Sequence, residues 1–301
     1  MAVEEKPINE RNLLFAPAIF NSACTTVGAL ESFKEQGIEI DDYIGYGAGG
    51  AVLALSASGK SEKEILEALK KTPNIENNMA EYLGNMTFGE LKEKTGKNLM
   101  IQTTQINPDG TKSALIFSAD NFKNLPIAEA CRVSTTLNSP LGVITKRPTK
   151  TRELQFEGKT YTCCDGNMSA REIPDLIHMK EYKNRIISTM KFPIHPRSKR
   201  IANIMEACNI KLAPHVSFFS AVPPKFRSKH NINNLIDSLS VKGSQETKNQ
   251  IEKNINLKNL VPHTKVPEVI IPQRQHVPSF VRDINRSNRF AGMPQIDKKK
   301  G

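Results

Sequence analysis

Short apolar blocks alternate with polar segments between residues 12 and 182, and glycines or prolines stand where many blocks end. Continuous or alternating apolar runs predict strands, whereas apolar residues three or four positions apart predict amphipathic helices. The expected strands are 12–16, 38–44, 99–106, 113–117, 154–156 and 161–164, and the expected helices are 27–36, 48–57, 65–71, 91–97, 127–136 and 173–182. Strands that alternate with helices favour a three-layer α/β domain with a mostly parallel central sheet.

Two local signals refine these elements. Ser61 stands three residues before Glu64 at a helix start, which is the spacing of a capping box. The Pro-Asp-Gly sequence at 108–110 is typical of a tight turn and predicts a hairpin between the two strands that flank it.

Length and composition indicate one large domain followed by a tail. The chain has 301 residues, of which 38% are hydrophobic and 24% charged, a globular balance. Its 18 prolines and mean hydropathy of −0.41 indicate that part of it lies outside a packed core. We expect an α/β domain over residues 10–225, a helical or irregular extension over 226–257, and a basic, proline-containing tail over 258–301 that is extended or disordered.

Positive charge is concentrated in the C-terminal part. Residues 1–175 hold 19 Lys and Arg against 23 Asp and Glu, a net of −4, whereas residues 176–301 hold 23 against 8, a net of +15. This asymmetry favours an anionic lipid or membrane surface as partner, and a solvated basic face would explain it equally well. An aromatic content of 6% without tryptophan disfavours nucleic acid. The basic residues singled out in the tail are Arg274, Arg282, Arg286, Arg289, Lys298, Lys299 and Lys300.

Cysteines and histidines give no metal-site pattern. The five cysteines include no C-x-x-C pair, and no two of the six histidines are four positions apart. We therefore expect buried free thiols, no metal and no cofactor.

Targeting signals are not evident. The longest apolar stretch, 48–57, is about half of the ~20 residues that a membrane-spanning helix needs. Residues 1–6 carry acidic side chains where a secretory signal carries basic ones. We expect a cytoplasmic protein without a cleaved signal or transmembrane helix, able to act at membrane surfaces.

A glycine-rich segment at 45–50 has two interpretations. Gly45, Gly47 and Gly50 satisfy the G-x-G-x-x-G pattern of dinucleotide-binding turns. That site also needs a following strand with an acidic ribose ligand, yet the next segment, 61–71, is a predicted helix, so we expect no nucleotide cofactor. The alternative is a nucleophile elbow, a sharp strand-to-helix turn with small residues around its apex.

Several segments, taken in order, resemble the patatin-like phospholipase family of lipid acyl hydrolases over residues 12–180. They are a first helix ending in glycine at 28–38, the elbow at 44–51 with Gly47 at its apex, a central hairpin at 99–117, a helix at 125–134 followed by Pro140, and Asp165-Gly166-Asn167 followed by Ile173-Pro174. Asp165 alone would read as an ordinary Asp-Gly turn residue. Its place in this series instead makes it similar to the family's dyad aspartate.

The resemblance implies a Ser-Asp dyad with a glycine-rich oxyanion loop, and both the serine and the loop are replaced. The nucleophile position maps to Gly47, flanked by Gly45 and Gly49, while the base position maps to Asp165. The oxyanion glycines map to Ala18, Ile19 and Phe20. Losing a nucleophile costs on the order of 10⁶ in turnover, and losing one oxyanion donor costs ~2.7–4 kcal/mol.

The sequence therefore predicts a patatin-like pseudo-hydrolase that binds lipid, a membrane surface or a protein partner. One alternative is an active acyl hydrolase that uses a relocated nucleophile, for which Ser22, Cys24, Ser139 and Cys164 are candidates without an evident oriented base. Another is a self-assembling structural protein on the same scaffold.

Overall fold

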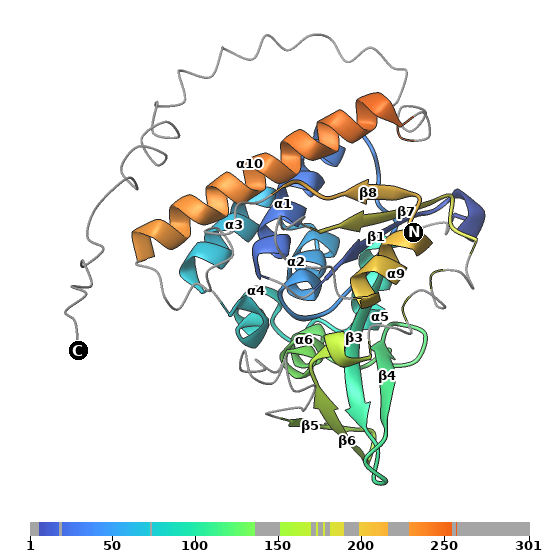
Figure 1. Ribbon diagram of the computed structural model, residues 1–301. Coiled ribbons are helices and arrows are strands. Elements are labelled where there is room, and N and C mark those ends of the chain that lie inside the picture. Colours follow the sequence, from blue (N-terminus) through green and yellow to red (C-terminus); the bar gives the residue numbers. More distant parts are fainter. Residues whose placement is uncertain are drawn as a thin grey trace, which may run out of the picture. The chain divides into compact units, whose positions relative to one another are not determined.

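The computed structural model describes residues 6–17, 20–72, 74–135, 151–169, 181–189, 199–215 and 229–254, together with Ile173, Ile177 and Leu257 (Figure 1). The strands are β1 (Asn12–Ala16), β2 (Asp42–Gly45), β3 (Asn98–Ile106), β4 (Lys112–Phe117), β5 (Arg152–Phe156), β6 (Lys159–Cys164), β7 (Asn184–Ser188) and β8 (Ile210–Leu212). The α-helices are α1 (Phe20–Glu35), α2 (Gly47–Ala57), α3 (Glu62–Lys71), α4 (Met79–Leu83), α5 (Phe88–Thr95), α6 (Ile127–Ser134), α9 (Lys199–Ala207) and α10 (Lys229–Lys253). Short 3-10 helices are η1 (Ile8–Glu10), η2 (Ile75–Asn77) and η3 (Gly166–Met168).

The described strands form one mixed sheet. Its order is β5-β6-β3-β2-β1-β7-β8, and β4 pairs with β3 off this path. The pairs β1–β2, β1–β7, β2–β3 and β7–β8 are parallel, whereas β3–β4, β3–β6 and β5–β6 are antiparallel. The predicted α/β class with a mostly parallel central sheet is confirmed.

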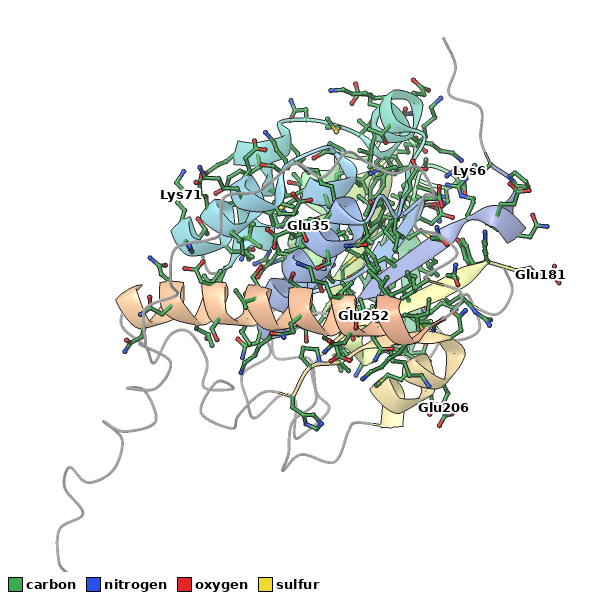
Figure 2. The ribbon with its side chains drawn as sticks, turned by 90° about the horizontal axis from the view of Figure 1, so that it is seen from above. Lys6, Glu35, Lys71, Glu181, Glu206 and Glu252 are labelled. Atoms are coloured by element: carbon green, nitrogen blue, oxygen red, sulfur yellow. The ribbon has the colours of Figure 1, made fainter. Side chains whose placement is uncertain are left out.

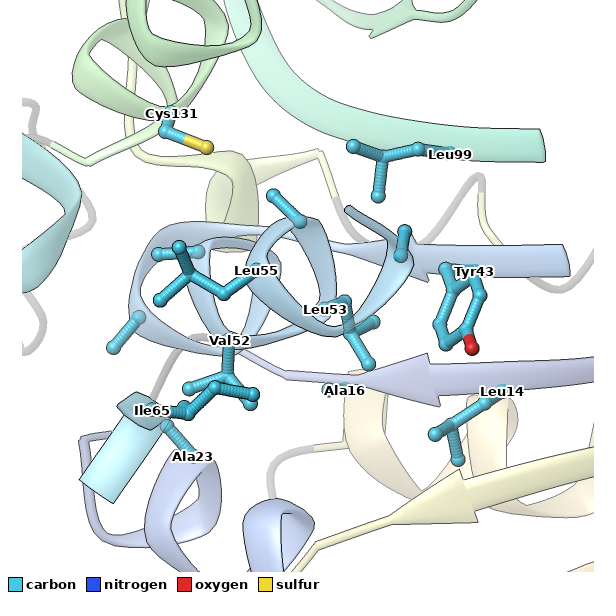
Figure 3. Packing of buried hydrophobic residues seen from close by; sticks show 14 of the residues in the cluster. Leu14, Ala16, Ala23, Tyr43, Val52, Leu53, Leu55, Ile65, Leu99 and Cys131 are labelled. Carbon is cyan, nitrogen blue, oxygen red and sulfur yellow. The ribbon is translucent and has the colours of Figure 1, made fainter. Parts of the chain in front are cut away.

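Helices cover both faces of this sheet. Successive residues of a strand point to opposite faces, and in β1 Leu14 and Ala16 join a core formed with α1, α2, α3, α6 and α10. Figure 3 shows this core around α2, with Leu14 and Ala16 of β1 beside it. Leu13 and Phe15 instead join a second core that includes Ile204 of α9. The three-layer arrangement follows from this alternation.

The predicted capping box at the start of α3 is confirmed, and the structure adds a second one at α5. Ser61 accepts a hydrogen bond from the Glu64 amide while the Glu64 carboxylate accepts one from the Ser61 amide, as the sequence predicts for α3. Thr87 and Glu90 form a second capping box, so α5 begins at Phe88 and not at the expected residue 91.

Helix α1 begins at Phe20, seven residues before the expected start at residue 27. Residues 21–26 are small or polar and include weak helix formers. The hydroxyls of Thr25 and Thr26 nevertheless donate to the Ser22 carbonyl inside the helix, and the segment is buried. Tertiary packing therefore outweighs the local propensity. Strand β2 likewise begins at Asp42 and not at residue 38.

The expected helix over 173–182 does not reach its predicted end. Ile173 and Ile177 are helical, but Glu181 and Tyr182 are not, because the chain straightens there to enter β7. The sequence pattern missed β7 and β8, whose apolar runs are very short, and it also missed α4 and α9.

Helix α10 falls in the segment 226–257, expected as a helical or irregular extension, and lies along α1 within the compact unit Met1–Pro262 (Figure 1). A Cβ atom built on Gly28 of α1 would overlap the carbonyl oxygen of Ser240, and one built on Gly243 would overlap that of Thr25. The two backbones therefore touch at these glycines. Glu35 of α1, labelled in Figure 2, pairs with Lys248 of α10 at 2.9 Å.

Candidate functional site

The turn between β2 and α2 has a backbone conformation that suits glycine. Tyr46 is extended, with φ −146° and ψ 157°, and Gly47, the first residue of α2, has φ +55°. A residue with a Cβ pays roughly 1–2 kcal/mol in this left-handed region. The Gly47 N–H donates to the buried hydroxyl of Ser134 at the end of α6, with an N–O distance of 3.3 Å.

The neighbouring glycines allow the end of β1 to approach this turn. A Cβ atom on Gly49 would lie 2.5 Å from the Pro17 carbonyl oxygen, and one on Gly45 would lie 2.9 Å from the Ala16 oxygen. The chain that follows β1 therefore passes directly beside the first turn of α2. Gly45 and Gly49 have a packing role that is independent of any chemistry.

The positions mapped to the oxyanion loop come directly after Pro17 in the sequence. Ala18 and Ile19 lie outside the described residues, and Phe20 is the first residue of α1, with its side chain also outside them.

Strand pairing brings the end of β6 to the end of β2. Ile101 of β3 pairs with Gly45 and with β4, while Thr104 pairs with Cys164 and with β4. Because β4 occupies one edge of β3 from Ile101 to Ile106, β2 and β6 share the other edge. Strand β2 runs parallel to β3 and β6 runs antiparallel to it, so their C-terminal ends meet head-on beside residues 102 and 103.

Asp165 stands at this meeting point. It directly follows β6 and is partly buried. A Cβ atom on the next residue, Gly166, would lie 2.7 Å from Cβ of Tyr46 and 2.6 Å from the Gln102 carbonyl oxygen. The structure therefore brings the Asp165-Gly166 turn against the residue that precedes Gly47.

Side chains from the middle of β3 hold this turn. Three consecutive residues each donate to one of three consecutive carbonyl oxygens: Thr103 Oγ1 to Cys164 at 2.7 Å, Thr104 Oγ1 to Asp165 at 2.8 Å and Gln102 Nε2 to Gly166 at 3.2 Å. All three donor residues are fully buried. We call this set the β3 clamp. Its sequence signal is the polar run Gln-Thr-Thr-Gln inside an otherwise apolar strand.

A buried carboxyl, Glu76 of η2, belongs to the same neighbourhood. Burial raises its pKa to about 7, against the opposing effects of a backbone hydrogen bond at Glu76 itself and of the Arg152 guanidinium, and the charge of Asp165 adds to the increase. Sequence reasoning missed Glu76, since a single acidic residue between Ile75 and Asn77 gives no periodic signal.

The candidate replacement nucleophiles that the structure describes are inaccessible. Ser22, Cys24 and Cys164 are at most 1% exposed. Burial raises the pKa of Cys164 to about 11 and raises that of Cys24 further, which keeps both thiols protonated at neutral pH. Ser139 lies outside the described residues.

Ser134, which contacts Gly47, is also fully buried. Its hydroxyl donates to the Cys131 carbonyl oxygen at 2.9 Å. It fills space behind the turn and has no exposed face.

None of the basic residues singled out in the tail is among the described residues. They are Arg274, Arg282, Arg286, Arg289, Lys298, Lys299 and Lys300.

Within the described ranges, Figure 2 labels several charged side chains. They include Lys71, whose Nζ pairs with the Glu81 carboxylate at 3.1 Å, and Glu206. The same ranges contain no cluster of three His, Cys, Asp or Glu side chains able to hold a metal. Among the helices described, none has the length and apolar character needed to cross a membrane.

Comparisons with known proteins give structural similarity alone. No family model and no curated protein sequence matches the chain. ExoU of Pseudomonas aeruginosa, solved as a heterodimer with SpcU from the type III secretion system, is 14% identical, with 84% of this chain and 53% of that chain covered and a TM-score of 0.41. VipD of Legionella pneumophila is 10% identical, with 84% and 68% covered and a TM-score of 0.49. The chain thus spans about half the length of the ExoU chain to which it is similar.

Proposed function

We propose that this chain is a patatin-like protein that acts by binding and does not hydrolyse esters. The observation that carries the proposal is the turn at Gly47. It has the strand-to-helix form of a nucleophile elbow and lies beside the Asp165-Gly166 turn, yet its apex has no side chain.

An acyl-enzyme needs an oxygen or sulfur nucleophile within reach of a base. Asp165 is in the place where the family's base would stand, and Gly47 gives it no group to activate. The buried positions of Ser22, Cys24 and Cys164 argue against these three as relocated nucleophiles within the described ranges. These facts together support a non-catalytic site.

The β3 clamp supports a binding role for what remains. Three buried donors still hold the carbonyl oxygens around Asp165, although the position opposite lacks a nucleophile. Buried hydrogen bonds of this kind keep a turn rigid. A rigid acidic turn beside a small-residue elbow is suited to holding a ligand or a partner segment.

We expect the purified full chain to show no turnover of phospholipid or lysophospholipid esters above buffer, and no labelling by a serine-directed fluorophosphonate. The Asp165→Asn variant should give the same baseline. Gly47→Ser should also stay near it, since a hydroxyl alone does not restore oxyanion donors. Turnover in the native chain that is lost in Asp165→Asn would contradict the proposal and favour an acyl hydrolase with relocated residues.

The partner we propose is an anionic lipid surface met by the basic C-terminal part. Each Lys or Arg near such a surface contributes about 1 kcal/mol, and salt screens the attraction over ~8 Å at physiological ionic strength. We expect co-sedimentation with vesicles containing phosphatidylserine, weaker binding in high salt, and weaker binding of a chain truncated after residue 257.

Vesicles of phosphatidylcholine alone are the control. Equal binding to both vesicle types, or binding to neither, would contradict a lipid partner and leave a protein partner as the alternative. Light scattering over a range of protein concentrations distinguishes a lipid or protein partner from self-assembly, which would appear as an oligomer mass that rises with protein concentration.

A further inference from the structure

Glu76 is an ionisable group in a setting that opposes its charge. It lies in the short helix η2, is 3% exposed, and its Oε2 atom has no hydrogen-bond partner among the described residues. An ionised carboxylate without full hydrogen bonding is costly to bury, so such a group tends to stay protonated.

The elements packed against η2 offer little compensation for a negative charge. Those with the most extensive packing are α2, α4 and α6. Helix α2 has no ionisable side chain. On α4, Glu81 is paired with Lys71, and on α6, Glu129 is paired with Arg132 at 2.7 Å. Two other ionisable groups stand on these elements, the buried Tyr82 hydroxyl of α4 and the Cys131 thiol of α6. The thiol, shown in Figure 3, interacts with the Glu76 charge.

The positive charge that acts on Glu76 is the Arg152 guanidinium, which already donates hydrogen bonds to other groups. Arg152 reaches from β5, and its Nη1 donates to Asn77 Oδ1 and to the Arg132 carbonyl oxygen, each at 2.6 Å. It therefore ties η2 to the end of α6 and attracts the Glu76 charge without a direct salt bridge in the described structure. Asp165, on the candidate site, repels that charge.

We propose that Glu76 is a pH-responsive latch: in its protonated form it keeps η2 packed against α2 and α6, and its ionisation loosens the segment 74–83. Because α6 also supplies Ser134 to the Gly47 turn, the latch lies next to the candidate site. It would work in the same way whether or not that site hydrolyses esters.

The direction of the pH effect follows from the two states. In the opened segment Glu76 would have an ordinary pKa near 4.5, whereas burial raises it to about 7 in the closed one. The closed state is therefore favoured most below the lower pKa, loses stability as the pH rises between the two values, and changes little above the upper one. Between about pH 5.5 and about pH 8, the opening equilibrium should increase about 30-fold.

Hydrogen exchange measured by mass spectrometry on the full chain tests the latch. After correction for the intrinsic pH dependence of exchange, peptides covering 74–83 should open about 30-fold more at the higher pH. Peptides from β1 and β3 should not change. Glu76→Gln, which keeps the shape and removes the charge, should abolish the difference, and Glu81→Gln, an exposed glutamate on neighbouring α4, should retain it.

Three results would overturn the latch. They are equal protection of 74–83 at both pH values, an undiminished pH difference in Glu76→Gln, and a loss of protection that extends equally to the central strands. If Glu76→Gln does not fold, the comparison of the native peptides at the two pH values still decides between these outcomes.

Discussion

Replacing Gly28 with alanine is expected to lower the free energy of unfolding by about 3 kcal/mol or more, at the upper end of what overpacking costs. The added methyl would overlap the Ser240 carbonyl oxygen and lie 2.7 Å from the Ser244 amide nitrogen. Both are backbone atoms of α10, so no side-chain rotation can relieve the clash. Helix α10 must move away from α1, which also weakens the Ser32–Ser244 hydroxyl contact of 2.8 Å.

Urea unfolding measures this loss as a lower midpoint urea concentration with an unchanged dependence of the unfolding free energy on urea. Gly243→Ala, on the other side of the same contact, should be similarly destabilising, and the double variant should cost less than the sum because one helix displacement relieves both clashes. Ser238→Ala, an exposed change on α10, should stay within about 0.5 kcal/mol. A loss below about 1 kcal/mol for Gly28→Ala would show that α10 does not pack on α1 as described.

The substitution Asp42→Asn is expected to lower the free energy of unfolding by about 3–5 kcal/mol, which is typical when one partner of a buried ion pair is removed. Asp42 begins β2 and is fully buried, and its Oδ1 accepts a bond from Arg11 Nη2 at 2.5 Å. Arg11 is only 4% exposed, so Asp42→Asn would remove the carboxylate charge that its buried guanidinium faces. Tyr182 packs at the same end of the sheet, where burial and the charge of Asp42 raise its pKa.

The matched comparison is the double replacement Arg11→Met with Asp42→Leu, which removes both charges together. Apolar replacement of a whole buried pair is often close to neutral, so the double variant should be more stable than Asp42→Asn. Glu81→Gln, which breaks the exposed pair with Lys71, should cost less than about 1 kcal/mol. The prediction is contradicted if Asp42→Asn lowers the free energy of unfolding by no more than Glu81→Gln does in the same urea titration.

The elements predicted well are those whose signals are local. Residues 12–16 form β1, 61–64 cap α3, and the turn at 108–110 joins β3 to β4, since alternation, capping and turn chemistry each depend on a few neighbouring residues. Strand β7 escaped prediction because it has only two adjacent apolar residues, Ile186 and Ile187, and its place between β1 and β8 is set by tertiary pairing. The position of α10 escaped for a similar reason, as the fit between Gly28 and Gly243 exists only where the two helices cross.

For the candidate site, the sequence by itself determined that a glycine-rich turn joins β2 to α2 and that an Asp-Gly turn follows β6. Only the tertiary structure decided that these turns meet, because that depends on β2 and β6 sharing one edge of β3. It also decided the character of Glu76. A side chain's identity is written in the sequence, whereas its pKa depends on how much water and charge the folded chain leaves around it.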